Sequence, residues 1–236
     1  MQKNKIKLRS KFGWGTNIQK MGNTIMSNTK TDNTTDNTKT DNIIDVNTFM
    51  NNVCIKMNQQ ISDFEIIRIL ENGRKNYPDF DINWADDKLK HTLLMSSVLM
   101  NRTELVRYLL SVPGINVNQK NICYNSALTY VLYESQIPIL KLLVSREDLD
   151  VNIQKNGWTS LHSACYANSE QRVKILLSNE RIDPSIRTNE GETALDIALS
   201  RKYYGIVKML DNSWYMSLKI MFEKCIVCRR NKNTKK

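Results

Sequence analysis

Few side chains in this sequence could carry out catalysis. Among the 236 residues there are two histidines, His91 and His162, and Cys165 follows the second by three positions. That spacing would place a thiol and an imidazole on one side of a helix. A cysteine activated by histidine also needs a group that orients the imidazole and donors that stabilise an oxyanion, and neither is evident. We therefore predict no catalytic residue and expect Cys165 to pack as a small apolar side chain.

Cys225 and Cys228 have the spacing of a metal-binding or redox pair. A structural zinc ion needs four ligands, and no second cysteine pair or histidine lies nearby in the sequence. A thioredoxin-like pair is expected within a strand–helix–strand context, which these residues do not favour. Because Arg229, Arg230 and Lys232 follow directly, acylation beside a basic cluster is an open alternative. We predict no metal and no cofactor.

The excess positive charge lies at the two ends of the chain. The net charge is +10: residues 1–42 carry 8 basic and 3 acidic groups, residues 211–236 carry 7 and 2, and residues 43–210 carry 19 of each. The sequence has no glycine-rich phosphate loop, and its central aromatic residues are not interleaved with basic ones as in a strand-binding groove. We expect contacts with nucleic acid or anionic membrane only through the tails, and no small-molecule substrate.

The first 43 residues differ from the rest in composition. Residues 27–42 read SNTKTDNTTDNTKTDN and include no apolar side chain, so we predict a disordered basic and Asn-Thr-rich tail over 1–43. An organelle-targeting presequence is an alternative interpretation of the Lys-rich start. Five scattered cysteines do not form a disulfide framework, and no apolar run of about 18 residues occurs. These features favour a cytoplasmic location.

A repeat of 33 to 34 residues occupies the middle of the chain. Three ladders of apolar residues share the separations 34, 33 and 34: Leu94, Leu128, Leu161, Leu195; Val106, Leu140, Val173, Val207; and Leu109, Leu143, Leu176, Leu210. Each unit begins at a hydroxyl residue suited to cap a helix, namely Thr92, Ser126, Thr159 and Thr193. Two apolar runs with helical spacing follow in each unit. The pattern predicts stacked helix pairs that share one continuous core.

These units resemble the ankyrin repeat. Residues 159–164 read TSLHSA, close to the family's T-P-L-H-x-A, and Gly157 and Gly191 keep its turn glycine. Val117-Asn118 and Val151-Asn152 match the Val-Asn that closes the family's repeat. The resemblance implies an all-α fold, an ankyrin-type α-solenoid of helix-pair repeats with short β-hairpin turns. It also implies that His162 has a structural role.

The sequence departs from the family pattern at a few positions. Lys90 and Tyr124 stand where the turn glycine belongs in the first two units, and Pro138 lies near the start of a second helix, where proline is tolerated. We interpret the substituted glycines as a sign of looser outer repeats. The abundance of Asn and Lys is typical of an AT-rich source, such as a large DNA virus.

The repeats predict the division of the chain into domains. We expect four repeats at about 84–118, 119–152, 153–186 and 187–210, within an array over 44–210. Residues 44–83 would form a divergent capping repeat, because their run EIIRIL resembles ELVRYL of the next unit. Residues 211–236 would form a C-terminal capping helix and a basic tail, with Trp214, Leu218, Met221, Phe222 and Cys225 on one stripe.

The resemblance also implies a function, that of a non-enzymatic module that binds another protein, such as a host protein, through a concave face. Transferred position by position, the partner-binding residues are Lys88, His91, Ile122, Asn125, Tyr133, Glu134, Lys155, Trp158, Tyr166, Asn189, Glu192 and Arg201, with Leu99, Met100, Ala167 and Ser200 beside them. Large aromatic side chains are typical hot spots, so we single out Tyr133, Trp158 and Tyr166. The alternative for Trp158 is that it only packs against the next hairpin.

Two other functions stay open. A peripheral tether could hold membrane or nucleic acid through the basic tails, with acylation at Cys225 and Cys228. A cysteine-dependent or zinc enzyme would need partners for its thiols that are not evident. We expect a monomer, located in the cytoplasm, or in the cytoplasm or nucleus of a host if the source is viral.

Overall fold

The computed structural model describes residues 45–59 and 61–211. The predicted disordered tail over 1–43, the pair Cys225 and Cys228, and all of the predicted C-terminal cap except Asp211 lie outside these residues and stay predictions. Over the described ranges, no helix is both long enough and apolar enough to cross a membrane.

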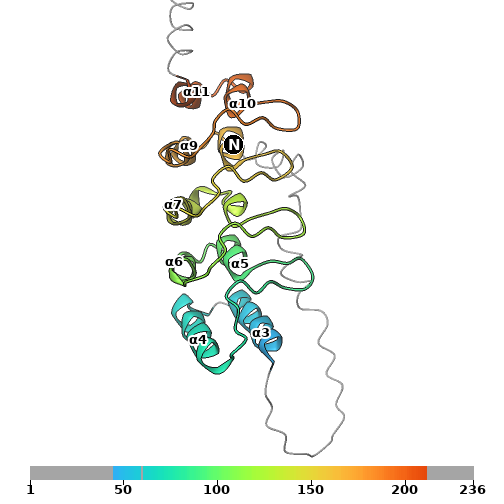
Figure 1. Cartoon of the computed structure of the whole chain (residues 1–236). Helices are drawn as coiled ribbons and strands as arrows, with labels where there is room; N and C mark the ends of the chain where they lie inside the picture. The colour runs from blue at the N-terminus through green and yellow to red at the C-terminus, as the bar shows by residue number, and fades with distance from the viewer. Residues whose placement is uncertain (1–44, 60, 212–236) are drawn as a thin grey trace, which may run out of the picture.

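The described chain folds into nine α-helices and two 3₁₀ turns. They are α3 (Val46–Asn58), α4 (Asp63–Asn76), α5 (Leu93–Leu99), α6 (Thr103–Ser111), η1 (Leu128–Tyr130), η2 (Glu134–Gln136), α7 (Ile137–Val144), α8 (Ser160–Tyr166), α9 (Glu170–Leu177), α10 (Ala194–Ser200) and α11 (Tyr204–Leu210). Helices α4, α6, α7, α9 and α11 form an outer column, and α3, α5, α8 and α10 belong to an inner one (Figure 1). The hairpin loops project on the other side of the inner column (Figure 1). This is the predicted α-solenoid.

The inner helices begin at the predicted caps. The hydroxyl of Thr92 accepts a hydrogen bond from the amide of Met95 at 3.2 Å, and that of Thr193 accepts one from Asp196 at 3.2 Å. Each accepted bond satisfies a backbone donor that has no partner inside the helix. After these helices the chain passes through a left-handed residue, at Asn101, Asn168 and Lys202, which lets it turn into the outer helix.

The predicted first helix of the second unit is wrong. Only the two 3₁₀ turns form there, and the chain between them is extended, with φ −78° and ψ 92° at Val131 and φ −114° and ψ 153° at Tyr133. The other units carry a small residue at the position of Val131, namely Ser97, Ala164 and Ala198, each 0% exposed. A β-branched side chain is bulkier and less favourable in a helix. We infer that Val131 prevents the inner helix from packing at this closely packed position.

The side chain of Gln136 replaces backbone bonds that the broken helix lacks. Its Oε1 accepts hydrogen bonds from the amides of Leu132 at 2.8 Å and Tyr133 at 3.1 Å. Its Nε2 donates to the carbonyl of Val98 in the preceding unit at 2.7 Å. Gln136 is 2% exposed, so its side chain is shielded from water while it bonds these backbone groups.

Arg172 supports the same break from the following unit. Its Nη1 donates to the carbonyl of Val131 at 3.1 Å, and its Nε lies 4.0 Å from Oε1 of Glu134. The side chain is buried, and burial lowers its pKa, with Glu134 acting in the opposite direction. The same position of the other outer helices holds a buried aliphatic residue, namely Leu105, Ile139 or Ile206. The buried guanidinium of Arg172 thus bonds the backbone carbonyl of Val131 in the preceding unit, at the place where the helix is broken.

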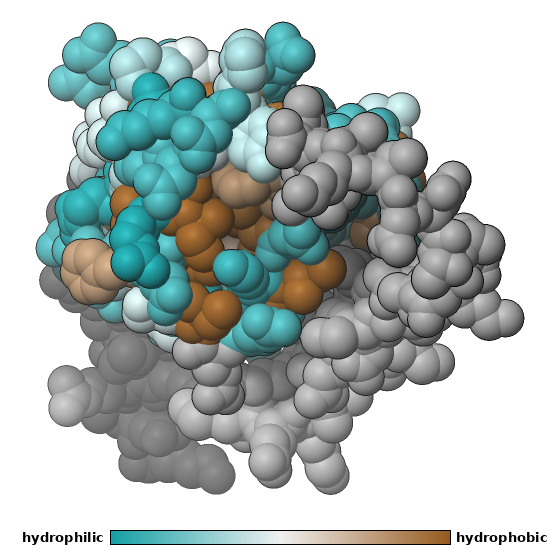
Figure 2. Space-filling model, turned by 90° about the horizontal axis from the view of Figure 1, so that it is seen from below, coloured by the Kyte–Doolittle hydropathy of each residue, from teal (hydrophilic) through white to brown (hydrophobic). Residues whose placement is uncertain are grey.

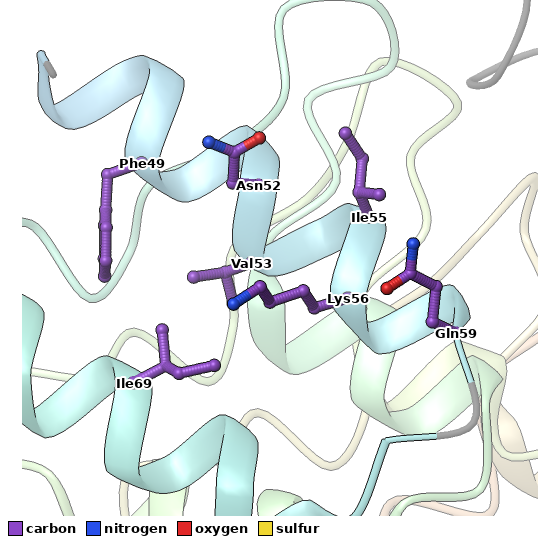
Figure 3. Close-up of a pocket in the computed structure, with 7 residues that line it drawn as sticks. All are labelled: Phe49, Asn52, Val53, Ile55, Lys56, Gln59 and Ile69. Atoms are coloured by element: carbon purple, nitrogen blue, oxygen red, sulfur yellow. The ribbon is translucent and has the colours of Figure 1, made fainter.

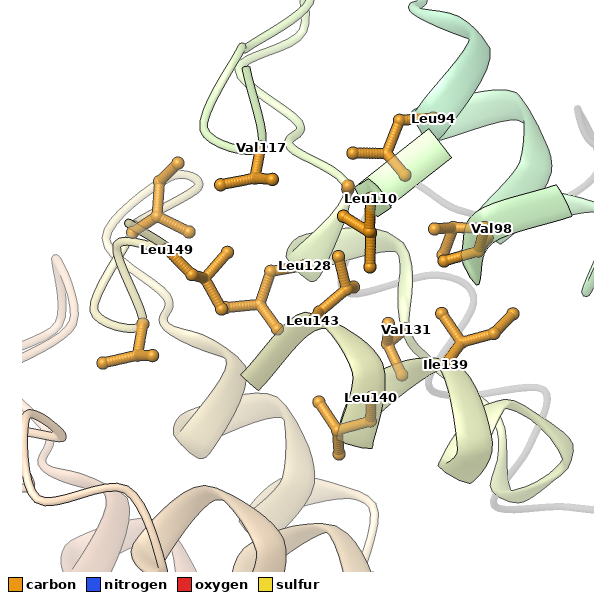
Figure 4. Packing of buried hydrophobic residues seen from close by; sticks show 14 of the residues in the cluster. Leu94, Val98, Leu110, Val117, Leu128, Val131, Ile139, Leu140, Leu143 and Leu149 are labelled. Carbon is orange, nitrogen blue, oxygen red and sulfur yellow. The ribbon is translucent and has the colours of Figure 1, made fainter. Parts of the chain in front are cut away.

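The three predicted ladders form the core (Figure 4). Leu128 and Leu143 are 0% exposed, and Leu94 and Leu140 are 1% exposed. In the last unit Val207 is 0% exposed as well, whereas Leu195 and Leu210 are half-buried. Each layer therefore completes the core of its neighbours, as expected for stacked repeats.

Asparagine side chains join each hairpin to the next one. Asn118 donates from Nδ2 to the carbonyl of Asp148 at 2.7 Å and accepts at Oδ1 from the amide of Asp150 at 2.7 Å. Asn83 and Asn152 make equivalent pairs of bonds with the units that follow them. These are the residues of the Val-Asn pattern and its equivalent at Asn83, so the pattern has a structural reason. The next equivalent position is Ser185, whose hydroxyl bonds Asp183 within its own turn.

Candidate functional site

The inner face is the name we give to one surface of the array. It is formed by the hairpin tips and by the residues at the ends of the inner helices. Each tip contains a residue with positive φ at the same position of the repeat, namely Lys90 at 54°, Tyr124 at 59°, Gly157 at 79° and Gly191 at 81°, and the third tip has a second one, Asn156 at 49°. Lys90 and Tyr124, which depart from the glycine pattern, thus adopt a left-handed backbone conformation as the glycines do. A non-glycine residue in this region costs roughly 1–2 kcal/mol.

Side chains at the base of each tip hold its backbone. Asp86 accepts hydrogen bonds from the amides of Lys88 at 3.0 Å and His91 at 2.6 Å. Asn121 does the same for Cys123 at 3.0 Å and Asn125 at 2.9 Å. These bonds hold the backbone of the first two tips, which therefore present their side chains from a fixed frame.

The predicted partner-binding residues fall into three groups. Six are exposed: Lys88, Ile122, Tyr133, Glu134, Asn189 and Arg201. Three are half-buried, His91, Lys155 and Glu192, and three are buried, Asn125, Trp158 and Tyr166.

Trp158 and Tyr166 differ from the expectation that they lie open in a groove. They are 9% and 6% exposed, and their rings meet edge to face at 5.6 Å between centroids. The ring centroid of His162 lies 5.9 Å from that of Trp158. The guanidinium carbon of Arg201 lies over the ring of Tyr166, 3.6 Å from its centroid. Aromatic edge-to-face and cation–π contacts both favour this arrangement. The role of the two residues as partner contacts stays a prediction.

Asn125 is buried with a polar cluster between the first two tips. Nε2 of His91 lies 2.7 Å from the hydroxyl of Tyr130, which also accepts a hydrogen bond from Asn121 at 3.0 Å. Burial lowers the pKa of His91, partly opposed by Asp86, and raises the pKa of Tyr130 to about 12. The cluster thus joins two neighbouring tips through neutral groups.

His162 has the structural role that was predicted. Its Nδ1 accepts from the amide of Thr159 at 3.2 Å, and its Nε2 lies 3.0 Å from the carbonyl oxygen of Ile186. A carbonyl only accepts, so Nε2 carries the proton, and burial lowers the pKa of the ring. Cys165 is 0% exposed, and burial raises the pKa of its thiol to about 12. This thiol stays protonated and packs as a small apolar group, as predicted.

Tyr124 is an inner-face residue that the sequence analysis did not place in the site. It is 66% exposed, beside Ile122 at 57%. Tyr133 is 51% exposed and Met100 is 36% exposed, and both add apolar surface to the inner face. The signal that could have identified Tyr124 is an aromatic residue at a turn position that favours glycine.

The other surface feature is a hollow between α3 and α4, at one end of the array (Figure 3). Seen from that end, apolar residues are surrounded by polar ones (Figure 2). The hollow has a volume of about 260 Å³ and is lined by Phe49, Asn52, Val53, Ile55, Lys56, Gln59 and Ile69. Lys56 is the one titratable side chain in this lining, and no group of three or more His, Cys, Asp or Glu residues suited to a metal occurs in the part of the chain described.

Comparison with known proteins identifies the repeats. Residues 128–214 match the model of a family described as ankyrin repeats (3 copies). Ankyrin repeat and SAM domain-containing protein 6 of Rattus norvegicus is 27% identical over 116 residues, which are 49% of this chain and 13% of that protein. SMC5-SMC6 complex localization factor protein 1 of Bos taurus is 35% identical over 101 residues, 42% of this chain and 10% of that protein. An ankyrin repeat protein of fowlpox virus is 33% identical over 139 residues, 55% and 40% of the two chains. The chain thus spans less than half the length of each relative.

Proposed function

Because this chain is an ankyrin repeat protein, we propose that it binds another protein through the inner face of its first two units. Ankyrin repeats are general modules of protein–protein interaction. One relative is named a localization factor of the SMC5-SMC6 complex, and that name supports a role beside other proteins. The proposal assigns no reaction to the chain.

One observation carries this proposal, the exposure of large apolar side chains on one part of the inner face. Met100, Ile122, Tyr124 and Tyr133 are 36%, 57%, 66% and 51% exposed and come from neighbouring units. Exposed aromatic and aliphatic groups near charged ones are typical of interface hot spots. Lys88 and Glu134, both exposed, supply such charges.

The test uses two tyrosines with nearly equal exposure on different faces. Tyr133 on the inner face is 51% exposed, and Tyr204, at the start of outer helix α11, is 49% exposed. The full chain, with either residue replaced by alanine, is immobilised, and partners are captured from a lysate of the cells that make it. We expect Tyr133→Ala to weaken capture of one discrete protein at least tenfold, within the range measured for hot spots.

Tyr204→Ala is the matched control and should leave capture unchanged. A photoreactive phenylalanine analogue at position 133 should cross-link to the same captured protein, whereas one at position 204 should not. The proposal is contradicted if a double variant, Tyr133→Ala with Ile122→Ser, captures the protein as well as the wild type does. This comparison requires that the double variant melts at the same temperature as the wild type.

A further inference from the structure

A chain of hydrogen bonds joins the first hairpin tip to the backbone of the second. Nε2 of His91, in the first tip, lies 2.7 Å from the hydroxyl oxygen of Tyr130. That oxygen accepts a hydrogen bond from Nδ2 of Asn121 at 3.0 Å. Oδ1 of Asn121 in turn accepts from the amides of Cys123 at 3.0 Å and Asn125 at 2.9 Å. We call His91, Tyr130 and Asn121 the tip relay.

The backbone held by Asn121 carries the two most exposed apolar side chains of the proposed site. Ile122 and Tyr124 follow Asn121 in the second tip and are 57% and 66% exposed. The amides that Asn121 bonds are those of the residues directly before and after Tyr124. Asn121 itself is 5% exposed, so water does not readily replace a bond that its side chain loses. The orientation of Asn121 therefore affects how both apolar side chains are presented.

The bonds of Tyr130 determine where its hydroxyl proton lies. Because the oxygen accepts from Asn121, the O–H group needs an acceptor of its own, and within the described residues the acceptor that it meets is Nε2 of His91. Nε2 is therefore unprotonated, and the neutral ring carries its proton on Nδ1. Burial raises the pKa of Tyr130 to about 12 and lowers the pKa of His91, which agrees with this assignment.

Protonation of His91 is incompatible with this arrangement. The charged ring has hydrogens on both nitrogens and no acceptor, so Nε2 cannot accept from the Tyr130 hydroxyl. The O–H group has to turn away and leave its acceptor, or the ring has to move. Both changes alter the bond from Asn121 to the hydroxyl oxygen, because that bond depends on the directions of the oxygen's lone pairs. The charge state of His91 thus acts on the second tip.

The charged and titratable groups around His91 come from its own tip and from the elements packed against it. Asp86 accepts from the amide of His91 at 2.6 Å and favours the charged ring, against the larger effect of burial. Asp87 and Lys90 pair with each other at 3.1 Å. The ring of Tyr130 meets that of His91 edge to face, with 5.5 Å between centroids. The other titratable groups near this cluster are Lys88, Cys54 of α3 and Cys123 of the second tip. Because burial outweighs Asp86, the ring is neutral at pH 7 and becomes charged on acidification.

We propose that the tip relay is a pH-sensitive link that regulates the inner face. With His91 neutral, the relay fixes the second tip relative to the first. With His91 protonated, the second tip is released and the inner face binds its partner more weakly. The effect on binding rests on the proposed function, whereas the release of the tip is a property of the protein alone.

The amide of Ile122 reports the link, because it donates to the carbonyl of Leu89 in the first tip at 3.2 Å. Its hydrogen exchange in the full chain is measured by NMR at pH 7.5 and pH 5, relative to an unstructured peptide at the same pH. We expect protection to fall about two- to tenfold at pH 5, the effect of one lost hydrogen bond. The nitrogen chemical shifts of the His91 ring identify its tautomer and should show the proton on Nδ1 at pH 7.5.

Tyr130→Phe removes the hydroxyl and keeps the ring, so it breaks the relay without a change of charge. Protection of Ile122 in this variant should be low at pH 7.5 and no longer depend on pH, whereas His162→Gln should keep the pH dependence. A matched amide is that of Asp150, which donates to Oδ1 of Asn118 at 2.7 Å. This bond joins two units without a histidine, so its protection should stay the same.

The inference is overturned by unchanged protection of Ile122 at pH 5, by a pH dependence that persists in Tyr130→Phe, or by a proton on Nε2 of the neutral ring. Capture of the partner by the wild type should weaken at pH 5, and capture by Tyr130→Phe should be weak at both pH values. Release of the tip with unchanged capture would reject the regulatory role and leave the proposed function intact. If Tyr133→Ala does not alter capture, the proposed function fails, and the exchange of Ile122 still decides whether the relay releases the tip.

Discussion

The backbone of Tyr124 has φ of 59°, although its ring gains little from packing at 66% exposure. Without a bound partner, the protein therefore bears a conformational free-energy cost at Tyr124. Two other units avoid this cost because they have glycine at the same position. Such a cost is consistent with a side chain retained for what it contacts outside the fold.

We predict that Tyr124→Gly raises the free energy of unfolding by about 0.5–1 kcal/mol, since relief of the left-handed conformation exceeds the added entropy of the unfolded chain. Urea unfolding followed by circular dichroism measures this change. Gly191→Ala is the reverse control: φ is 81° there, and no atom lies within 4 Å of an added Cβ. It should destabilise the protein by a similar amount, and a destabilising Tyr124→Gly would refute the account.

The two histidines make stability depend on pH. Burial lowers the pKa of His91 and of His162 below the usual 6.5. The folded protein therefore binds fewer protons than the unfolded one as pH falls below about 6.5, so stability declines on acidification. The lowered pKa values of Asp148 and Asp196 act in a more acidic range, below the usual 3.8.

We predict a lower urea midpoint at pH 5.5 than at pH 7.5, with the difference reduced in His162→Gln. The substitution removes one of the two titrating rings, so part of the pH dependence should persist through His91. Equal midpoints at the two pH values in the wild type would show that neither histidine titrates differently on folding.

At the scale of elements, the second unit shows how side chains can replace some of the backbone hydrogen bonds of a missing helix. Gln136 bonds the amides of Leu132 and Tyr133 and the carbonyl of Val98, and Arg172 bonds Val131. Both buried side chains bond the backbone at or near Tyr133, so we infer that they are positioning residues for the proposed site.

We predict that Gln136→Ala costs about 1–3 kcal/mol of stability, because one buried and two part-buried backbone groups lose their partner. Hydrogen exchange at the amides of Leu132 and Tyr133 should accelerate in the same variant. Gln171→Ala, an exposed glutamine of α9, should change stability by less than about 0.5 kcal/mol. Unchanged exchange at Leu132 would show that the side chain of Gln136 does not hold the break.

At the scale of the whole molecule, the leucines of one ladder lie in different layers of the same core. Leu143 is 0% exposed in the second unit, whereas Leu210 in the last unit is half-buried. We predict that Leu143→Ala costs about 3–5 kcal/mol and Leu210→Ala about 1–2 kcal/mol, since an interior layer has packed neighbours on both sides. Urea unfolding of both variants measures the difference. Equal costs would mean that the last layer is as well packed as the middle.

The repeated features of the fold could be predicted because they depend on local pattern. The hydroxyl caps, the ladders and the bonds of His162 each follow from a motif of a few residues. The broken helix could not be predicted in this way, because it depends on Val131 in a closely packed position and on Arg172 from the next unit. The burial of Trp158 likewise reflects a contact with Tyr166, on which Arg201 of the following unit stacks.

The asparagine bonds between hairpins have a mechanical consequence. Each one joins a layer only to its neighbour, so a pulling force applied at the two ends of the described array acts on these links in series. The array should therefore extend as a soft spring before it yields. Single-molecule stretching should show successive yielding steps of roughly 110 Å, the contour length of one repeat of about 33 residues. Asn118→Ala and Asn152→Ala should each lower the force at which one of these steps occurs.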